Sequence, residues 1–414
     1  MKQSLFLFSF LILYVANSCK RDVIRLNESD ILSYKDIISL FVRPNNDTID
    51  IYQFIDSIYY VKLEFLDESI IGHINKIIIF DNRIFVLDGQ TSSIFIFDIK
   101  GKYISKICKI GNGPGEYNRL DDFDIDRENQ NIIITDLLTY WNIRYDINGN
   151  FISRKKIPLS IEGLASLSNG QFVSFSNFRS NTQFLEPEYN LLYLDSMMQI
   201  EKGYFQYQSS YFHNPSIKFY GTQSGPFYKL GNELHFHYKM KNEIYIINQD
   251  GVFLKYQFDF NGMNFDYSRI YRKRNLYEYF HHGKYWTVHN VCETPDILYF
   301  SFFENSNRKL HYGFLRKSTK NIINSSILRL GKFYFSGYTI ASYDNWFISV
   351  LEIDELLNWK NSMDNINEQL SQKGYNGPPN LFLDNYALIN KKRLADELTV
   401  DDNPVLMFYR IKPF

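Results

Sequence analysis

The chain has 414 residues, of which 45% are hydrophobic and 22% charged, enough for a large buried core and for one to three domains. Its 45 basic residues stand against 46 acidic ones, so the formal net charge of −1 provides no positive field to attract a polyanion. This composition excludes a disordered chain and argues against nucleic acid as a partner. Aromatic residues reach 17%, with 36 Phe and 32 Tyr, which favours a β-rich fold.

The first residues have the pattern of an export signal. Lys2 precedes an apolar run from Leu5 to Val15, and Ala16-Asn17-Ser18-Cys19 follows. The run of about 11 residues is shorter than the roughly 20 that a membrane-spanning helix needs. The segment resembles a bacterial lipoprotein signal, so we expect residues 1–18 to be removed and Cys19 to be lipidated. Ordinary secretion, with Cys19 as a bystander, is the alternative.

From about residue 70, short apolar runs alternate with turn residues in a recurring unit. Phe97-Asp98-x-x-Gly101 returns 48 residues later as Tyr145-Asp146-x-x-Gly149, and Ile132 to Asp136 stands where Ile84 to Asp88 stood. Further units lie near residues 171, 233, 297 and 346, and the third is the least regular. Four-stranded units at this spacing are typical of a β-propeller. We therefore expect an all-β fold, a six-bladed β-propeller of antiparallel blades over residues 51–414.

Two strand-like runs outside the repeat predict how the ring closes. Ile58 to Leu63 precedes the first unit, and Val405 to Ile411 follows the last. Because an exposed blade edge invites aggregation, we expect the early strand to complete the last blade. Residues 19–50 are then a lipidated N-terminus and linker. Apolar residues at helical spacing from Leu356 to Leu370, and a second segment near Ala387 to Glu397, predict a helical insertion in the last blade.

The stretch Gly111-Asn112-Gly113-Pro114-Gly115-Glu116-Tyr117 has three glycines at alternate positions, as in a phosphate cradle. A P-loop requires Lys and then Ser or Thr after the last glycine, and here Glu116 and Tyr117 follow. The dinucleotide fingerprint also fails, because the third glycine comes one residue early and the next segment, Leu120 to Asp126, is strand-like. Pro114 further removes a backbone donor. We interpret the stretch as a turn by which the chain leaves one blade and starts the next.

Several of these motifs occur together in one known family. Gly113 to Tyr117, the acidic Asp121 to Asp124, the lipoprotein-like start and the ending Asp402 to Leu406 resemble the six-bladed β-propeller lipoproteins of Bacteroidota-type bacteria. The resemblance covers nearly all of the chain after the signal. The family is largely uncharacterised, so the resemblance implies a fold and an accessory envelope role, sometimes beside glycan or peptide uptake systems, but no activity.

Three histidines are candidate metal ligands. His235 and His237 alternate on one strand and so face the same side. If that side is the central channel, they can bind a divalent metal with His289, although packing without a metal is the simpler interpretation.

Other charged residues admit two interpretations each. Glu116, Asp121 and Asp124 can serve as paired carboxylates or bind calcium, while turn capping explains them more simply. The basic stretch Arg269 to Phe280, followed by His281-His282, can recognise an anionic group or form a solvated helix face.

Beyond Cys19 the chain has only Cys108 and Cys292. They either form one disulfide or are two small buried hydrophobic residues, and we favour burial because a domain of this size needs no cross-link. No Cys-x-x-Cys pattern exists, which excludes a cysteine zinc site.

We expect a monomeric, non-catalytic outer-membrane lipoprotein without a cofactor, facing the periplasm or the cell surface. It would bind a protein, peptide or glycan through a propeller face. One alternative is a metal-dependent hydrolase or lyase with its site at the central channel. Another is a carbohydrate-binding accessory protein of an uptake system, using exposed aromatic platforms. No Gly-x-Ser-x-Gly elbow or His-Glu-x-x-His helix identifies an enzyme.

Overall fold

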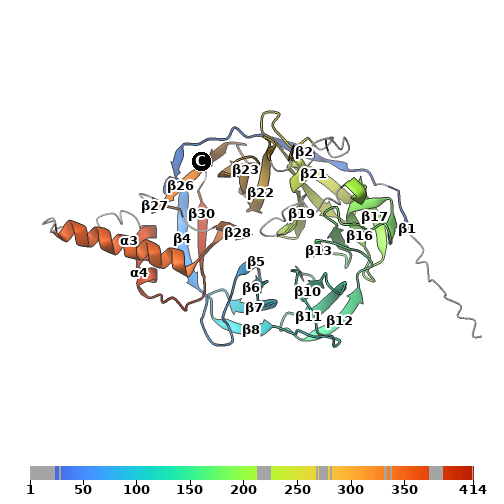
Figure 1. The fold of residues 1–414 in the computed structure, drawn as a ribbon, viewed down its shortest axis with the longest axis horizontal. Coiled ribbons are helices and arrows are strands. Elements are labelled where there is room, and N and C mark those ends of the chain that lie inside the picture. Colours follow the sequence, from blue (N-terminus) through green and yellow to red (C-terminus); the bar gives the residue numbers. More distant parts are fainter. Residues whose placement is uncertain are drawn as a thin grey trace, which may run out of the picture.

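The computed structural model describes residues 24–27, 29–211, 225–266, 269, 278–279, 282–330, 333–335, 338–372, 386–412 and 414. Six blades of antiparallel strands stand around a central opening (Figure 1), so the expected six-bladed β-propeller is confirmed. The first strand of each blade faces the opening, and these inner strands contact one another around it.

The strands of the first three blades follow the chain from the inside outward. Blade 1 consists of β5 (Ile74–Phe80), β6 (Arg83–Asp88), β7 (Ser93–Asp98) and β8 (Tyr103–Ile107). Blade 2 consists of β9 (Asp122–Asp126), β10 (Asn131–Asp136), β11 (Trp141–Asp146) and β12 (Phe151–Lys156). Blade 3 consists of β13 (Gly163–Ser166), β14 (Phe172–Phe175), β16 (Glu188–Leu194) and β17 (Ile200–Tyr207).

The other three blades complete the ring. Blade 4 consists of β18 (Phe227–Leu230), β19 (Glu233–Tyr238), β20 (Glu243–Asn248) and β21 (Gly251–Asp259). Blade 5 consists of β22 (Trp286–Glu293), β23 (Ile297–Glu304), β24 (Leu310–Arg316) and β25 (Ile322–Ser325). Blade 6 consists of β28 (Tyr338–Tyr343), β29 (Trp346–Leu351), β30 (Val405–Ile411) and β4 (Ile55–Lys62).

Each blade is buried on both faces because it packs between two neighbours. Along β6, Ile84 and Val86 belong to the apolar cluster shared with blade 6, while Phe85 and Leu87 belong to the one shared with blade 2. Successive strand residues point to opposite faces, so a strand covered on both sides is a continuous apolar run. Six such clusters of described residues fill the six interfaces between blades.

The ring closes as the sequence indicates. The early strand β4 pairs antiparallel with the late strand β30, with Tyr60 opposite Met407, and thus forms the outer strand of blade 6. Between β29 and β30 the chain forms α3 (Ile353–Gln372) and α4 (Tyr386–Asp396), which lie outside the ring (Figure 1). The helical insertion is therefore confirmed, and the residues between the two helices lie outside the described part.

Residues expected to form a linker instead contain strands along the outer rim. We call residues 24–50 the N-terminal belt. In this belt β1 (Ile24–Arg25) pairs in parallel with β15 (Leu185–Glu186) beside blade 3, and β2 (Leu32–Phe41) pairs in parallel with β21 as a fifth strand of blade 4. Further on, β3 (Thr48–Asp50) pairs with β26 (Ile327–Leu330), which is also paired with β27 (Phe333–Tyr334). The belt crosses the outer edges of three consecutive blades (Figure 1).

Two buried aspartates at equivalent positions fasten the turns of blades 1 and 2. Asp136 Oδ1 accepts hydrogen bonds from the backbone N–H groups of Leu138 and Thr139, both at 3.0 Å, and Oδ2 accepts from Asn118 N at 2.8 Å. Asp88 makes the corresponding bonds in blade 1. The recurrence of Asp88 at Asp136 in the sequence thus reflects one turn used twice.

Neither cysteine beyond Cys19 is in a disulfide. Cys292 is buried, as favoured from the sequence, whereas Cys108 is exposed, which corrects the expectation that both are buried. Cys108 lies just after β8 ends, where the chain leaves the blade and the interior. Among the described residues, no helix is long and apolar enough to cross a membrane.

Candidate binding site at the central channel

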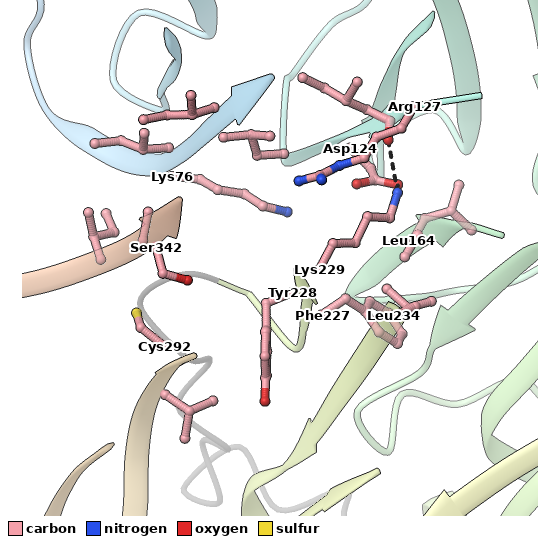
Figure 2. Close-up of a pocket in the computed structure, with 18 residues that line it drawn as sticks. Lys76, Asp124, Arg127, Leu164, Phe227, Tyr228, Lys229, Leu234, Cys292 and Ser342 are labelled. Atoms are coloured by element: carbon pink, nitrogen blue, oxygen red, sulfur yellow. Dashed lines mark hydrogen bonds and ion pairs between the residues drawn. The ribbon is translucent and has the colours of Figure 1, made fainter. Parts of the chain in front are cut away.

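The inner strands of all six blades line a narrow cavity of about 70 Å³ at the centre of the ring. Its walls are partly apolar, with Leu164, Val291 and Ile340 among them. Three cationic side chains, Lys76, Arg127 and Lys229, also line it, and Figure 2 shows them around the Asp124 carboxylate. The cavity is therefore a narrow tube with both apolar and cationic walls.

Two buried lysines are held by carboxylates of β9. Lys229 Nζ lies 2.7 Å from Asp124 Oδ2 and donates two further bonds, to Ile125 O at 2.8 Å and to Ser166 Oγ at 2.9 Å. Lys76 Nζ donates to Asp122 Oδ1 and to a backbone carbonyl of the same strand, both at 2.8 Å. The acidic run noted in the sequence thus supplies counter-ions for lysines of blades 1 and 4.

Burial and ion pairing shift the pKa values of these two carboxylates in opposite directions. Burial opposes the ionisation of both Asp122 and Asp124. It raises the pKa of Asp122 despite Lys76, whereas Lys229 and Lys76 together outweigh it at Asp124 and lower that pKa. Nearby, Asp121 Oδ2 accepts from Leu137 N at 2.8 Å, so Asp121 caps a turn.

Arg127 lies just past the end of β9. One terminal nitrogen donates to Gly231 O at 2.8 Å, and the guanidinium lies 5.9 Å from the centre of the Phe80 ring. Its Nε is buried and has no hydrogen-bond partner among the described residues. Burial lowers the pKa of Arg127, with Asp124 opposing that shift.

A larger pocket of about 450 Å³ adjoins the channel, and we call it the mouth pocket. It shares Arg127, Lys229 and Leu234 with the channel. Its remaining walls come from the ends of strands in blades 1 to 4 and are mostly polar: Asp126, Glu128, Ser166, Ser168, Asn232, Glu233 and Asn248, with Phe80, Leu167, Ile246 and Ile247. Its volume falls in the range of about 300–1,000 Å³ usual for ligand sites.

A second buried charge cluster joins blades 4 and 5. Glu293, at the end of β22, accepts from Lys317 Nζ at 2.6 Å, from Tyr228 Oη and Tyr256 Oη at 2.8 Å, and from Lys255 Nζ at 3.3 Å. Burial opposes its ionisation, but His235 and the lysines outweigh that effect and lower its pKa to about 2. The Glu293 carboxylate already accepts hydrogen bonds from side chains of both blades. We therefore infer that the cluster holds the two blades together.

His235, a predicted metal ligand, belongs to this cluster. Its Nε2 lies 2.9 Å from both Glu233 Oε1 and Lys255 Nζ, and its ring stacks on Tyr228 with centroids 4.8 Å apart. An ammonium group thus lies at the nitrogen that a metal would need.

The other two predicted ligands lie beside another lysine. His289 Nδ1 is 3.3 Å from Nζ of Lys239, which lies in the short helix η3 (Lys239–Lys241). Lys239 and His289 both disfavour a positive charge on the buried His237. Burial, with Lys239, lowers the pKa of His237 to about 3 and that of His289 to about 4. Among the described residues, no three His, Cys, Asp or Glu side chains are grouped to hold a metal ion, so His235, His237 and His289 do not assemble as a ligand set.

The glycine stretch forms the corner between β8 and β9. Gly111 N donates to Tyr117 O at 3.0 Å, and Glu116 Oε2 accepts from Gly113 N at 2.7 Å. A Cβ on Gly111 would meet Glu116 Oε2 at 2.1 Å. The carboxylate of Glu116 therefore fills the place that an anion would take in a phosphate cradle.

The candidate basic stretch is described only in part. Arg269 lies over the Tyr279 ring at 4.4 Å and 3.5 Å from Asp266 Oδ2. Arg272, Lys273, Arg274 and His281 lie outside the described residues.

Comparison with known proteins gives a family. Residues 37–410 match the model of a domain of unknown function, DUF4934. The chain belongs to the DUF4934 family. This match confirms the prediction that the chain belongs to a largely uncharacterised family. No curated protein matches the sequence.

Two solved structures from Bacteroides species are similar to this DUF4934 chain to different degrees. A structure named "Putative exported protein" from Bacteroides fragilis is similar with a TM-score of 0.70 and 19% sequence identity, covering 91% of this chain and 100% of its own. A member of the DUF4221 family from Bacteroides vulgatus has a TM-score of 0.46 and 9% identity, covering 86% of this chain and 97% of its own. At 19% identity, the likeness to the Bacteroides fragilis structure shows the fold alone.

Sequence reasoning missed the cationic residues of this DUF4934 channel. Lys76 and Lys229 are each a single charge within the first strand of their blade, among residues that are otherwise mostly apolar or aromatic. A lone lysine in a strand covered on both faces is a signal for an inward-facing charge. Which carboxylates it meets depends on how the blades are placed around the ring.

Proposed function

We propose that this protein is a non-catalytic binding lipoprotein of the cell envelope, which holds a protein, peptide or glycan ligand at the mouth of its channel. The observation that carries the proposal is the mouth pocket, about 450 Å³ in volume and continuous with a channel lined by cations. Its polar walls offer both donors and acceptors, which suits a ligand rich in amide or hydroxyl groups.

A binding role fits the charged groups better than catalysis does. Lys229 uses all three of its N–H donors on protein atoms, and Glu293 is saturated by two lysines and two tyrosines. Groups fixed in this way orient a ligand and do not exchange protons readily.

Envelope placement rests on the export signal and on Cys19 as the lipidated residue. The similar Bacteroides fragilis structure, named as an exported protein, is in keeping with this. The tryptophans do not favour the carbohydrate-platform alternative, since Trp286 is buried and Trp141, Trp346 and Trp359 are largely covered.

The test is a screen of the mature protein against peptide and glycan libraries, followed by calorimetry on any ligand found. Ser168 lines the mouth pocket, so Ser168→Trp should fill it and weaken binding at least tenfold. Ser318 lies in an exposed turn after β24, and Ser318→Trp is the matched control, which should bind as wild type does. Equal binding by both variants, no ligand in either library, or chemical conversion of the ligand would overturn the proposal.

A further inference from the structure

The channel contains cationic hydrogen-bond donors that no described protein atom uses. An ammonium group has three N–H donors, and Lys76 uses two of them, on Asp122 and on Phe123 O. The buried Nε of Arg127 has no partner among the described residues. Both side chains line the same cavity, and Figure 2 shows the Lys76 ammonium and the Arg127 guanidinium on the same side of the Asp124 carboxylate, opposite Lys229.

One cation of this space has no ion pair. Lys76 is paired with Asp122 and Lys229 with Asp124, whereas Arg127 makes no salt bridge among the described residues. An uncompensated charge away from water is costly, and an anion that pairs with it recovers that cost. A ligand with one negative charge balances the unpaired cation, whereas a phosphate dianion would leave one negative charge in excess.

The shape of the channel limits what can carry the charge. At about 70 Å³ it holds a few water-sized groups, and its apolar walls include Leu164, Ala165 and Ile340. A carboxylate at the end of a thin methylene stem fits such a tube, while a sugar ring is too wide for a cavity of this volume. Arg127 lines both the mouth pocket and the channel, so a chain lying in the mouth pocket can extend a carboxylate inward.

We propose that the channel is a carboxylate subsite for a peptide, in which Lys76 and Arg127 bind the side-chain or C-terminal carboxylate of the segment held in the mouth pocket. This inference rests on the proposed function and specifies its ligand as an acidic peptide. Guanidinium and carboxylate match as two parallel hydrogen bonds, which gives the subsite its selectivity.

The test uses small probes in calorimetry with the full mature chain. The carboxylate probe is the α-methylamide of N-acetylglutamate, whose only charge is its side-chain carboxylate, and the α-methylamide of N-acetylglutamine is its neutral match. Glucuronate and inorganic phosphate are the other anions. The glutamate amide should bind once per chain, and the glutamine amide should bind about 10- to 100-fold more weakly, since a hydrogen bond between charged groups is lost. Equal binding of the two amino-acid probes, or tighter binding of glucuronate or phosphate, would overturn the proposal.

Arg127→Gln should reduce the affinity for the glutamate amide by about the same factor without changing that for the glutamine amide. Arg25→Gln, on the exposed rim strand β1, is the matched control and should bind as wild type does. Circular dichroism shows that each variant is folded. Arg127 is the residue to change because replacing Lys76 would leave Asp122 buried and unpaired.

The two proposals fail in different ways. A macromolecular ligand that is lost in Ser168→Trp but retained at full affinity in Arg127→Gln leaves the binding function in place and removes the carboxylate subsite. Binding of the glutamate amide but not of the glutamine amide, with no macromolecular ligand in the screen, supports the carboxylate subsite and removes the proposed function.

Discussion

A buried histidine makes the stability of the propeller depend on pH. His237 is 2% exposed, and burial lowers its pKa from 6.5 to about 3. In the unfolded chain the imidazole takes up a proton below about pH 6.5, and in the folded protein it stays neutral until about pH 3. Protons therefore favour the unfolded state in that window, and the stability contributed by His237 is lost as the pH falls, by about 1.4 kcal/mol per unit.

The variant His237→Phe removes this titration and keeps a flat ring. Between pH 7.5 and pH 5 it should lose about 2 kcal/mol less unfolding free energy than wild type does, measured by urea denaturation at both values. The matched control is His73→Phe, because His73 is exposed. A parallel pH dependence in wild type and His237→Phe would show that the buried ring is not responsible.

The buried turn carboxylates are the other residue-scale feature with a measurable effect. Asp136→Ala leaves the N–H groups of Asn118, Leu138 and Thr139 without their acceptor, and should lower the unfolding free energy by about 2–3 kcal/mol. Asp401 is exposed, and Asp401→Ala should change stability by less than about 0.5 kcal/mol. If Asp136→Ala lowers the unfolding free energy no more than Asp401→Ala does, water molecules must take over the hydrogen bonds of the carboxylate.

At the scale of elements, the sequence revealed the strands whose own pattern is sufficient. The apolar run Ile84 to Leu87 is buried on both faces, so its composition alone predicts a strand, and its recurrence at Ile132 predicts the blade. The belt strand β2 has a different basis. It forms because the edge of β21 is available, and β21 lies more than 200 residues away in the chain. Pairing over such a distance leaves no local signature, which is why the segment was expected to be a linker.

The same limit applies to the candidate site. The acidic run Asp121 to Asp124 was recognised, but its partners come from two other blades. Lys76 belongs to the neighbouring blade 1, and Lys229 belongs to blade 4, which meets blade 2 at the central channel. The metal hypothesis for His235 failed for a related reason. Strand alternation places His235 and His237 on one face, but it does not reveal that Lys239 and Lys255 lie against these rings.

The belt strand can be tested with two neighbouring residues. Leu40 is 1% exposed in the cluster between blades 4 and 5, whereas Phe41 is 72% exposed. Leu40→Ala should lower the unfolding free energy by about 2–4 kcal/mol and increase proteolysis within residues 24–50. Phe41→Ala should stay within about 0.5 kcal/mol of wild type. Equal effects of the two changes would mean that β2 is not packed on blade 4.

At the scale of the molecule, the belt limits the length of the lipid tether that we propose at Cys19. Cys19 precedes Ile24 by five residues, which span at most about 17 Å when extended. A lipid on Cys19 therefore holds the rim of blade 3, where β1 pairs with β15, close to the bilayer. The helix α3 lies on the far side of the ring from β1 (Figure 1). The protein should stand on its blade 3 rim, with the mouth of the channel open to one side and accessible to a ligand.

Fluorescent labels on the lipidated protein in vesicles with a lipid-borne quencher test this orientation, in a Cys108→Ser background because Cys108 is exposed. A label at Gln183→Cys, beside β15, should be quenched strongly, and one at Asn361→Cys, on α3, weakly. A Gly/Ser insertion of about 20 residues after Arg21 would extend the tether by roughly 25 Å and should remove the difference. Mass spectrometry verifies that Cys19 carries lipid, so equal quenching at the two positions of a lipidated protein would contradict the orientation itself.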